Sequence, residues 1–172
     1  MAMLPRVAVV AVALAVLQAG CAEKTTRPAI TAVTLSLATS PAVGNPSKPI
    51  SADVRIRNVG NTRVWYTDGC GCDAISLRVL GPDGLEVLLR DPKASLPLCP
   101  CGFIPLESRQ SLGGRFDFFT GTLYVADHPT WPTPTYAAPP GTYTLIARFS
   151  YATSVPGEFL PLERRTTFTW AP

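Results

Sequence analysis

The chain has 172 residues, with 15 lysines and arginines against 12 acidic residues and a single histidine. This near balance, without any basic run, excludes the clustered basic face that nucleic-acid binding requires. The 18 prolines and 13 glycines leave few uninterrupted helix-forming stretches, which predicts many short strands joined by turns.

The N-terminal segment has the three parts of a secretory signal peptide. Residues 1–6 carry one positive charge, residues 7–17 are uniformly apolar, and small residues follow at Ala19 and Gly20. The apolar run is too short to cross a membrane, which takes about 20 apolar residues. Export with cleavage of residues 1–20 is therefore expected, and it leaves about 150 residues, enough for one domain.

The residues before Cys21 resemble the lipobox of bacterial lipoproteins, in which the leader is cut before a cysteine that carries a diacylglyceryl group. Ala19 and Gly20 match that pattern, whereas Gln18 stands where leucine is usual. The resemblance implies lipidation of Cys21 and, with Ala22 after it, an outer-membrane location in a Gram-negative host. Several acyl chains, at about 0.8 kcal/mol per buried methylene, anchor durably. Ordinary signal-peptidase cleavage, which leaves Cys21 as a thiol, is the alternative.

Residues 21–28 are polar without periodicity and are expected to form a lipidated tether, followed by one folded domain over residues 29–172. Within that domain several segments alternate apolar and polar residues, which predicts strands with one buried face. These segments are 30–37, 51–59, 62–66, 75–79, 85–89, 109–119, 142–151 and 164–170. Seven or eight strands in one domain predict an all-β, immunoglobulin-like β-sandwich.

Turn residues punctuate these strands. Residues 58–61 (Asn-Val-Gly-Asn) and 81–84 (Gly-Pro-Asp-Gly) each predict a β-hairpin, because glycine and asparagine tolerate the positive φ angles of tight turns. Gly113-Gly114 lies inside a predicted strand without the lysine of a phosphate-binding loop. That pair is therefore expected to mark a β-bulge.

Three of these features resemble small bacterial immunoglobulin-like domains, including those similar to the Bacillus intracellular proteinase inhibitor. They are the strand ending in an asparagine turn at 54–60, the hairpin at 81–84, and the Pro-Gly-Thr-Tyr at 140–143 that opens a late strand. The likeness covers about residues 30–170 and implies the fold. Protease inhibition through an exposed loop would rest on this likeness alone, because a fold does not imply a function.

Two Cys-x-Cys pairs, Cys70-Gly71-Cys72 and Cys99-Pro100-Cys101, are the most distinctive motif. Cysteines two residues apart on an extended segment point the same way about 6–7 Å apart, too far to bond to each other but suited to a facing segment. Export to an oxidising compartment favours disulfides. Two bridges between the segments are expected, each worth about 3–4 kcal/mol, with three pairings open.

The alternative reading makes the same four cysteines thiolate ligands of one Cu(I) or Zn²⁺ ion, because soft sulfur suits these metals. Zinc sites more often space paired cysteines by two or more residues. A strained bridge within one pair, or redox exchange between pairs, is a third reading. Asp68 and Asp73 flank the first pair and are expected to be solvated turn residues rather than ligands.

Catalytic patterns are weak in this chain. His128, the only histidine, lies in a proline-rich loop after Asp127, so a Ser-His-Asp arrangement would have to be assembled around it. No acidic cluster stands out as a carboxylate pair for hydrolysis. A surface histidine and a non-enzymatic protein are the expectation.

The arm, which we define as residues 124–140, combines Tyr124, Trp131 and Tyr136 with five prolines. A connection of this length is often functional, and tryptophan and tyrosine are enriched at binding hot spots. The arm is therefore a candidate partner-binding segment. In the alternative, Trp131 folds back and caps one end of the sandwich.

Together these features predict a lipid-anchored, non-enzymatic binding or assembly component of the bacterial cell envelope, with a protein partner and no cofactor. Its two disulfides would join Cys70 and Cys72 to Cys99 and Cys101. The alternative function is a thiolate lipoprotein that binds copper or zinc. The domain would stand on the outer membrane, on either its periplasmic or its surface face.

Overall fold

The computed structural model describes residues 32–69, 73–94 and 100–172, and its regular elements there are all β-strands. Among these residues no helical segment has the length and apolarity that a membrane crossing needs. The described strands are β1 (Val33–Ser40), β2 (Val43–Gly44), β3 (Ile50–Asn58), β4 (Val64–Asp68), β5 (Ile75–Leu80), β6 (Glu86–Val87), β7 (Gly102–Leu106), β8 (Ser111–Phe119), β9 (Thr122–Tyr124), β10 (Thr135–Ala137), β11 (Gly141–Tyr151) and β12 (Leu160–Trp170).

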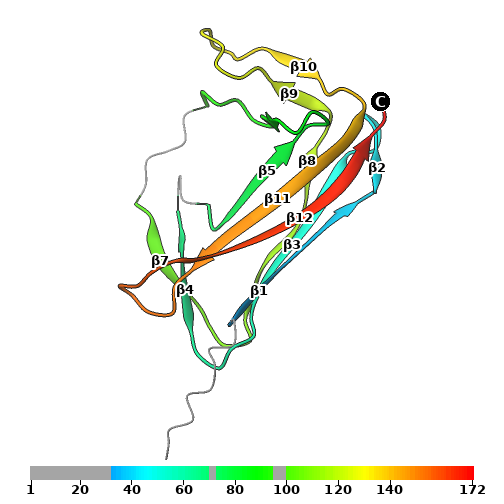
Figure 1. Ribbon diagram of the computed structural model, residues 1–172. Coiled ribbons are helices and arrows are strands. Elements are labelled where there is room, and N and C mark those ends of the chain that lie inside the picture. Colours follow the sequence, from blue (N-terminus) through cyan, green and yellow to red (C-terminus); the bar gives the residue numbers. More distant parts are fainter. Residues whose placement is uncertain (1–31, 70–72, 95–99) are drawn as a thin grey trace, which may run out of the picture.

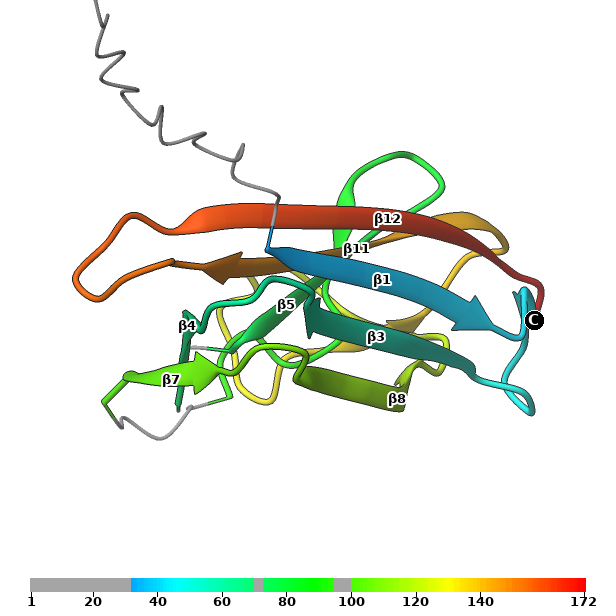
Figure 2. The ribbon, with the colours of Figure 1, turned by 90° about the horizontal axis from the view of Figure 1, so that it is seen from below.

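Two sheets face each other, and the predicted all-β sandwich is confirmed. One sheet has the order β1-β3-β8 and the other the order β2-β12-β11-β5-β6 (Figures 1 and 2). Eight of the described strands have five or more residues, which matches the number expected. The set differs, because β7 was not predicted and the predicted strand at residues 85–89 is reduced to β6. The remaining four are short pieces of two or three residues.

Alternating side chains of the longest strands fill the space between the sheets. In β11 the inward residues from Tyr143 to Tyr151 are buried at every second position, whereas Arg148 and Ser150 are exposed. From the opposite sheet, Val54 and Ile56 of β3 are fully buried. This period of two is the pattern that the sequence predicted.

An aromatic cluster joins the two sheets at one end. The ring of Phe119, from β8, lies 4.8 Å from Tyr143, 4.9 Å from Phe168 and 5.1 Å from Trp170, centroid to centroid. All four rings are essentially buried. Tilted and edge-to-face aromatic pairs contribute about 0.5–1.5 kcal/mol each beyond the burial of their surface, so this cluster is a main link between the layers.

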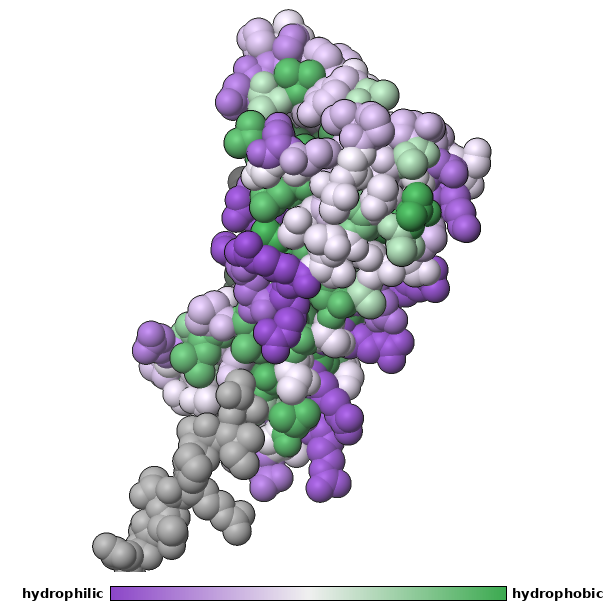
Figure 3. Space-filling model, turned by 45° about the vertical axis from the view of Figure 1, so that its right-hand side comes forward, coloured by the Kyte–Doolittle hydropathy of each residue, from purple (hydrophilic) through white to green (hydrophobic). Residues whose placement is uncertain are grey.

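The outer face of the larger sheet is polar. Glu163 accepts hydrogen bonds from Arg148 (2.6 Å) and Arg165 (2.8 Å), and these two guanidinium groups hold its pKa below the ordinary value. The side of the molecule in Figure 3 shows hydrophilic and hydrophobic groups interspersed. Exposed ion pairs of this kind are screened by solvent and contribute little to stability.

The predicted hairpin at residues 58–61 is wrong. β3 pairs with β1 and β8, whereas β4 pairs with β7, so residues 59–63 form a corner between sheets. The physical reason is Asn58, which is fully buried and donates its side-chain amide to the carbonyls of Thr62 (2.8 Å) and Leu106 (2.9 Å). Its Oδ1 accepts the Gly60 N–H at 3.0 Å.

The predicted hairpin at residues 81–84 is confirmed, whereas the irregularity in the β3–β8 pairing does not lie at the predicted Gly113-Gly114. β5 and β6 pair antiparallel around residues 81–84, with Gly84 at a φ of 80°. The register of β3 with β8 is unbroken at Gly113 and Gly114 and shifts instead between Ile50 and Ser51. Gly113 has a φ of 105°, and a Cβ there would collide with the Val54 carbonyl, so close backbone approach explains this glycine.

β4 and β5 act as two halves of one interrupted strand along the edge of β11. Trp65 of β4 forms a bridge with Ala152, and Ile75 of β5 pairs with Phe149. On the other side, β7 pairs with β4 and β6 with β5. The chain between β4 and β5 carries the first cysteine pair, and the chain between β6 and β7 carries the second.

Candidate functional site

The arm begins in the core. β9 and β10 pair antiparallel, with Leu123 opposite Tyr136. Leu123 is fully buried and Ala138 is 3% exposed, and the Ala138 N–H donates to the Gly121 carbonyl at 2.8 Å. The arm is thus a hairpin whose base belongs to the sandwich, although the sequence pattern predicted only a long connection.

The arm is held at its first residue and near its tip by the segment that follows β6. The Thr133 hydroxyl donates to a carboxylate oxygen of Asp91 at 2.6 Å, and the Tyr124 N–H donates to the Leu88 carbonyl at 2.9 Å. Thr133 is 4% exposed. The hydrogen bond from the Thr133 hydroxyl is the largest effect that lowers the pKa of Asp91 below its ordinary value of 3.8, and the hydrogen bond from the Lys93 N–H is the next largest. Sequence reasoning missed Asp91 and Thr133, because nothing local connects residues so far apart in the chain.

Trp131 does not fold back onto the sandwich. It retains 73% of its accessible surface, and Tyr136 retains 45%, whereas Tyr124 is half-buried. Tyr136 pairs with Leu123, while Tyr124 pairs with Thr135, the neighbour of Tyr136. Successive residues of a strand face opposite ways, so the structure places the two tyrosines on opposite faces of the hairpin rather than in one cluster.

A small apolar cavity of about 270 Å³ lies beside Tyr136. Its lining includes Pro82, Leu123, Tyr136, Pro139 and Tyr143, with Asp83 as its one carboxylate. The Tyr143 hydroxyl donates to the Pro139 carbonyl at 2.7 Å, and burial raises its pKa. The cavity therefore offers flat ring surfaces for an apolar group and no pair of carboxylates for hydrolysis.

The predicted disulfide site lies mostly outside the described residues, which exclude Cys70, Cys72 and Cys99. Cys101 is described, and its sulfur is disulfide-bonded. It adjoins the end of β4, because a Cβ on Gly69 would lie 3.3 Å from the Cys101 Cα. The pairing of the cysteines stays a prediction, as does lipidation at Cys21, which is also outside the described ranges.

The two aspartates beside the first cysteine pair and the histidine have partners close by in the sequence or the fold. Asp68 accepts the Gly69 N–H at 2.9 Å, and Asp73 lies 4.0 Å from Arg90. The Nδ1 of His128 lies 3.0 Å from the Thr130 hydroxyl. Within the ranges that the structure describes, no three histidine, cysteine or acidic side chains gather in a way that could hold a metal ion.

Comparisons with known proteins find neither a family nor a curated relative. No family model matches the chain, and no curated protein matches it. Similar solved structures include a β-glucosidase from Erythrobacter marinus, with 15% identity, a TM-score of 0.43 and coverage of 81% of this chain. A β-glucosidase from Listeria innocua has 13% identity, a TM-score of 0.39 and the same 81% coverage.

A third solved structure, the β-D-glucoside glucohydrolase of Trichoderma reesei, has 15% identity, a TM-score of 0.36 and 81% coverage of this chain. The chain spans only 15%, 16% and 19% of the lengths of these three enzymes. Similarity at this level identifies no activity for the chain.

Proposed function

We propose that this protein is a lipid-anchored, non-enzymatic component of the bacterial cell envelope that binds a protein partner through the arm. The observation that carries the proposal is the 73% exposed Trp131 on a hairpin whose base is buried and whose tip is hydrogen-bonded to Asp91. A large ring held out from a fixed support contributes contact area without ordering a flexible loop.

The position of the arm fits a tethered domain. β9 and β10 lie at one end of the molecule, and β1 begins toward the opposite end (Figure 1). The segment that carries Cys21 directly precedes β1 in the sequence. A domain anchored through Cys21 would therefore present Trp131 away from the membrane. The leader and the lipobox resemblance support the anchor, and the oxidising compartment supports disulfides among the four remaining cysteines.

The test is affinity purification of the full-length protein, tagged at its C-terminus, from envelope membranes. Trp131→Ala is expected to reduce the recovery of a co-purifying envelope protein at least about tenfold. Loss of a hot-spot side chain weakens the binding free energy by about 1.4 kcal/mol or more, which corresponds to that factor. Leu85→Ala is the matched control, because Leu85 is 68% exposed on the β5–β6 turn. Equal recovery of the partner with both variants would contradict binding through the arm.

The cysteines are tested on the same preparation. We expect no free thiol and no bound metal after unfolding, because bridges between the two segments consume all four sulfurs. Four reactive thiols released together with copper or zinc would instead favour the thiolate lipoprotein.

A further inference from the structure

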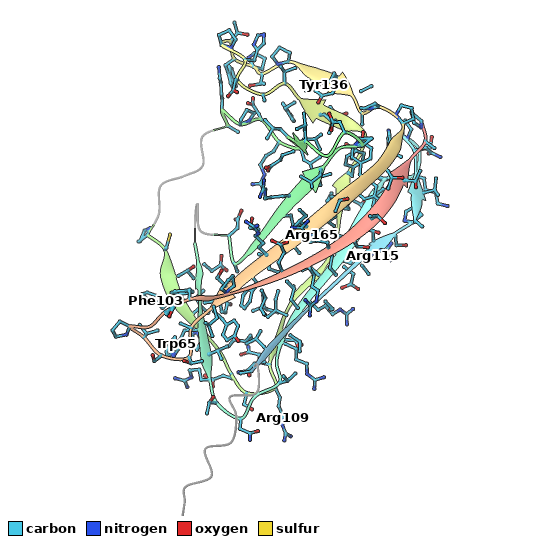
Figure 4. The ribbon with its side chains drawn as sticks, in the orientation of Figure 1. Trp65, Phe103, Arg109, Arg115, Tyr136 and Arg165 are labelled. Carbon is cyan, nitrogen blue, oxygen red and sulfur yellow. The ribbon has the colours of Figure 1, made fainter. Side chains whose placement is uncertain are left out.

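The β4–β7 ribbon carries aromatic residues on its outer face. Val64 and Leu106 pair with each other and are buried, so they occupy the inner face. Side chains alternate along strands, which places Trp65 and Phe103 on the outer face. Phe103 is 53% exposed, and its ring stacks on Phe159 at 6.1 Å, so burial in the core does not explain it (Figure 4). We call Trp65, Phe103 and Phe159 the aromatic patch.

The outward positions of β1 and β3 are mostly polar or charged and include Ser36, Arg55 and Arg57. The aromatic patch differs from these sheet faces. It also has a cation beside it, since the Arg63 guanidinium lies 5.3 Å from the Trp65 ring and 2.7 Å from Glu107.

The chain from the lipid anchor enters at this same end. The Ala32 carbonyl accepts hydrogen bonds from Val59 (2.7 Å) and Gly60 (3.1 Å), which fixes the start of β1 at the corner before β4. Residues 22–31 span at most about 35 Å when fully extended. They contain Lys24 and Arg27 with one acidic residue, Glu23, and Arg109 is exposed on the neighbouring turn (Figure 4).

We propose that the aromatic patch docks on the surface of the phospholipid bilayer that holds the anchor, an inference that rests on the proposed lipidation of Cys21. Tryptophan rings prefer the level of the lipid headgroups, and arginines are attracted to anionic lipids. A short tether keeps the patch at a high effective concentration near that surface. Docking orients the domain with the arm pointing away from the membrane.

The experiment uses the full-length protein purified from membranes and reconstituted in vesicles of phosphatidylethanolamine and phosphatidylglycerol with brominated acyl chains. Intact-mass spectrometry first determines whether the purified protein carries the acyl groups. The chain has three tryptophans, and Trp170 is 1% exposed, so in a Trp131→Phe background quenching by bromine reports on Trp65. We expect shallow bromines to quench severalfold more strongly than deep ones, and Phe103→Ser to weaken the quenching.

The two proposals fail in different ways. An acylated protein without bromine quenching would overturn docking and leave the anchor intact. A chain without an acyl group would overturn the anchor. Docking would then be measured on the same chain held to nickel-chelating lipids by an N-terminal histidine tag. Absence of bromine quenching in that arrangement would overturn docking as well. If Trp65 fluorescence changes only when envelope proteins are added, and not with lipid alone, the patch binds protein, and the bilayer is overturned as its occupant. The Trp65→Phe, Trp131→Phe variant gives the background from Trp170.

Discussion

Phe119 and Trp131 are large aromatic residues close together in the sequence, yet Phe119 has no exposed surface and Trp131 keeps 73% of its own. Phe119 ends a strand that pairs with β3 and faces three rings of the other sheet. Trp131 lies beyond the β9–β10 pairing, where no sheet covers it. The burial of a ring here follows from which strand pairs around it rather than from its hydrophobicity.

The largest expected effect is on the buried side of this comparison. Phe119→Ala removes the ring that links the sheets and should lower the free energy of unfolding by about 3–5 kcal/mol. Phe116→Ala, on the same strand but 41% exposed, should cost less than about 1 kcal/mol. Denaturant unfolding of both variants measures the difference, and similar losses would mean that the aromatic cluster does not hold the layers together.

A smaller effect is expected at the corner that replaces the predicted hairpin. Asn58→Ala leaves the Thr62 and Leu106 carbonyls without their donor, which should cost about 1–3 kcal/mol. Asn58→Asp should also destabilise, because a carboxylate cannot donate to a carbonyl. Asn45→Ala is the control, since the Asn45 side chain accepts a hydrogen bond from the exposed Ser47 N–H at 3.0 Å, and the backbone bonds of Asn45 are unaffected. Stability of Asn58→Ala equal to that of the control would contradict the role of Asn58.

The smallest effect concerns the exposed side, where Thr133→Val removes the hydrogen bond to Asp91. The free energy of local opening of the arm should fall, because one of its hydrogen bonds is lost. We expect hydrogen exchange of the Val125 N–H, which donates to the Pro134 carbonyl at 3.0 Å, to become severalfold faster. Exchange at the Ile146 N–H in the core strand is the control and should not change.

The same contact predicts a pH dependence. Because the pKa of Asp91 is lowered in the folded protein, its stabilising contribution is complete above the ordinary value of 3.8 and is lost as the pH falls through the lowered value. The arm should therefore loosen at strongly acidic pH in the unaltered protein. Thr133→Val should show a weaker acid dependence, and an identical acid profile would mean that Asp91 does not hold the arm.

The sequence by itself determined which residues face inward along the main strands. The alternation in β3 and β11 appears unchanged in the structure, because the two-residue period of a strand places every second side chain on one face whatever its partner. The hairpin at residues 81–84 was equally predictable, since glycine at a φ of 80° and a local Gly81–Leu85 hydrogen bond decide it within a few residues.

Tertiary structure decided which strands pair and where the arm stands. Residues 58–61 have the composition of a hairpin, but the buried amide of Asn58 bonds to Leu106, far along the chain, and turns the strand toward the other sheet. In the same way Asp91 and Thr133 meet only after folding. Contacts between residues distant in the sequence depend on the packing of both sheets at once, so no local sequence pattern predicts them. The exposure of Trp131 and the aromatic patch around Trp65 therefore became visible only in the folded domain.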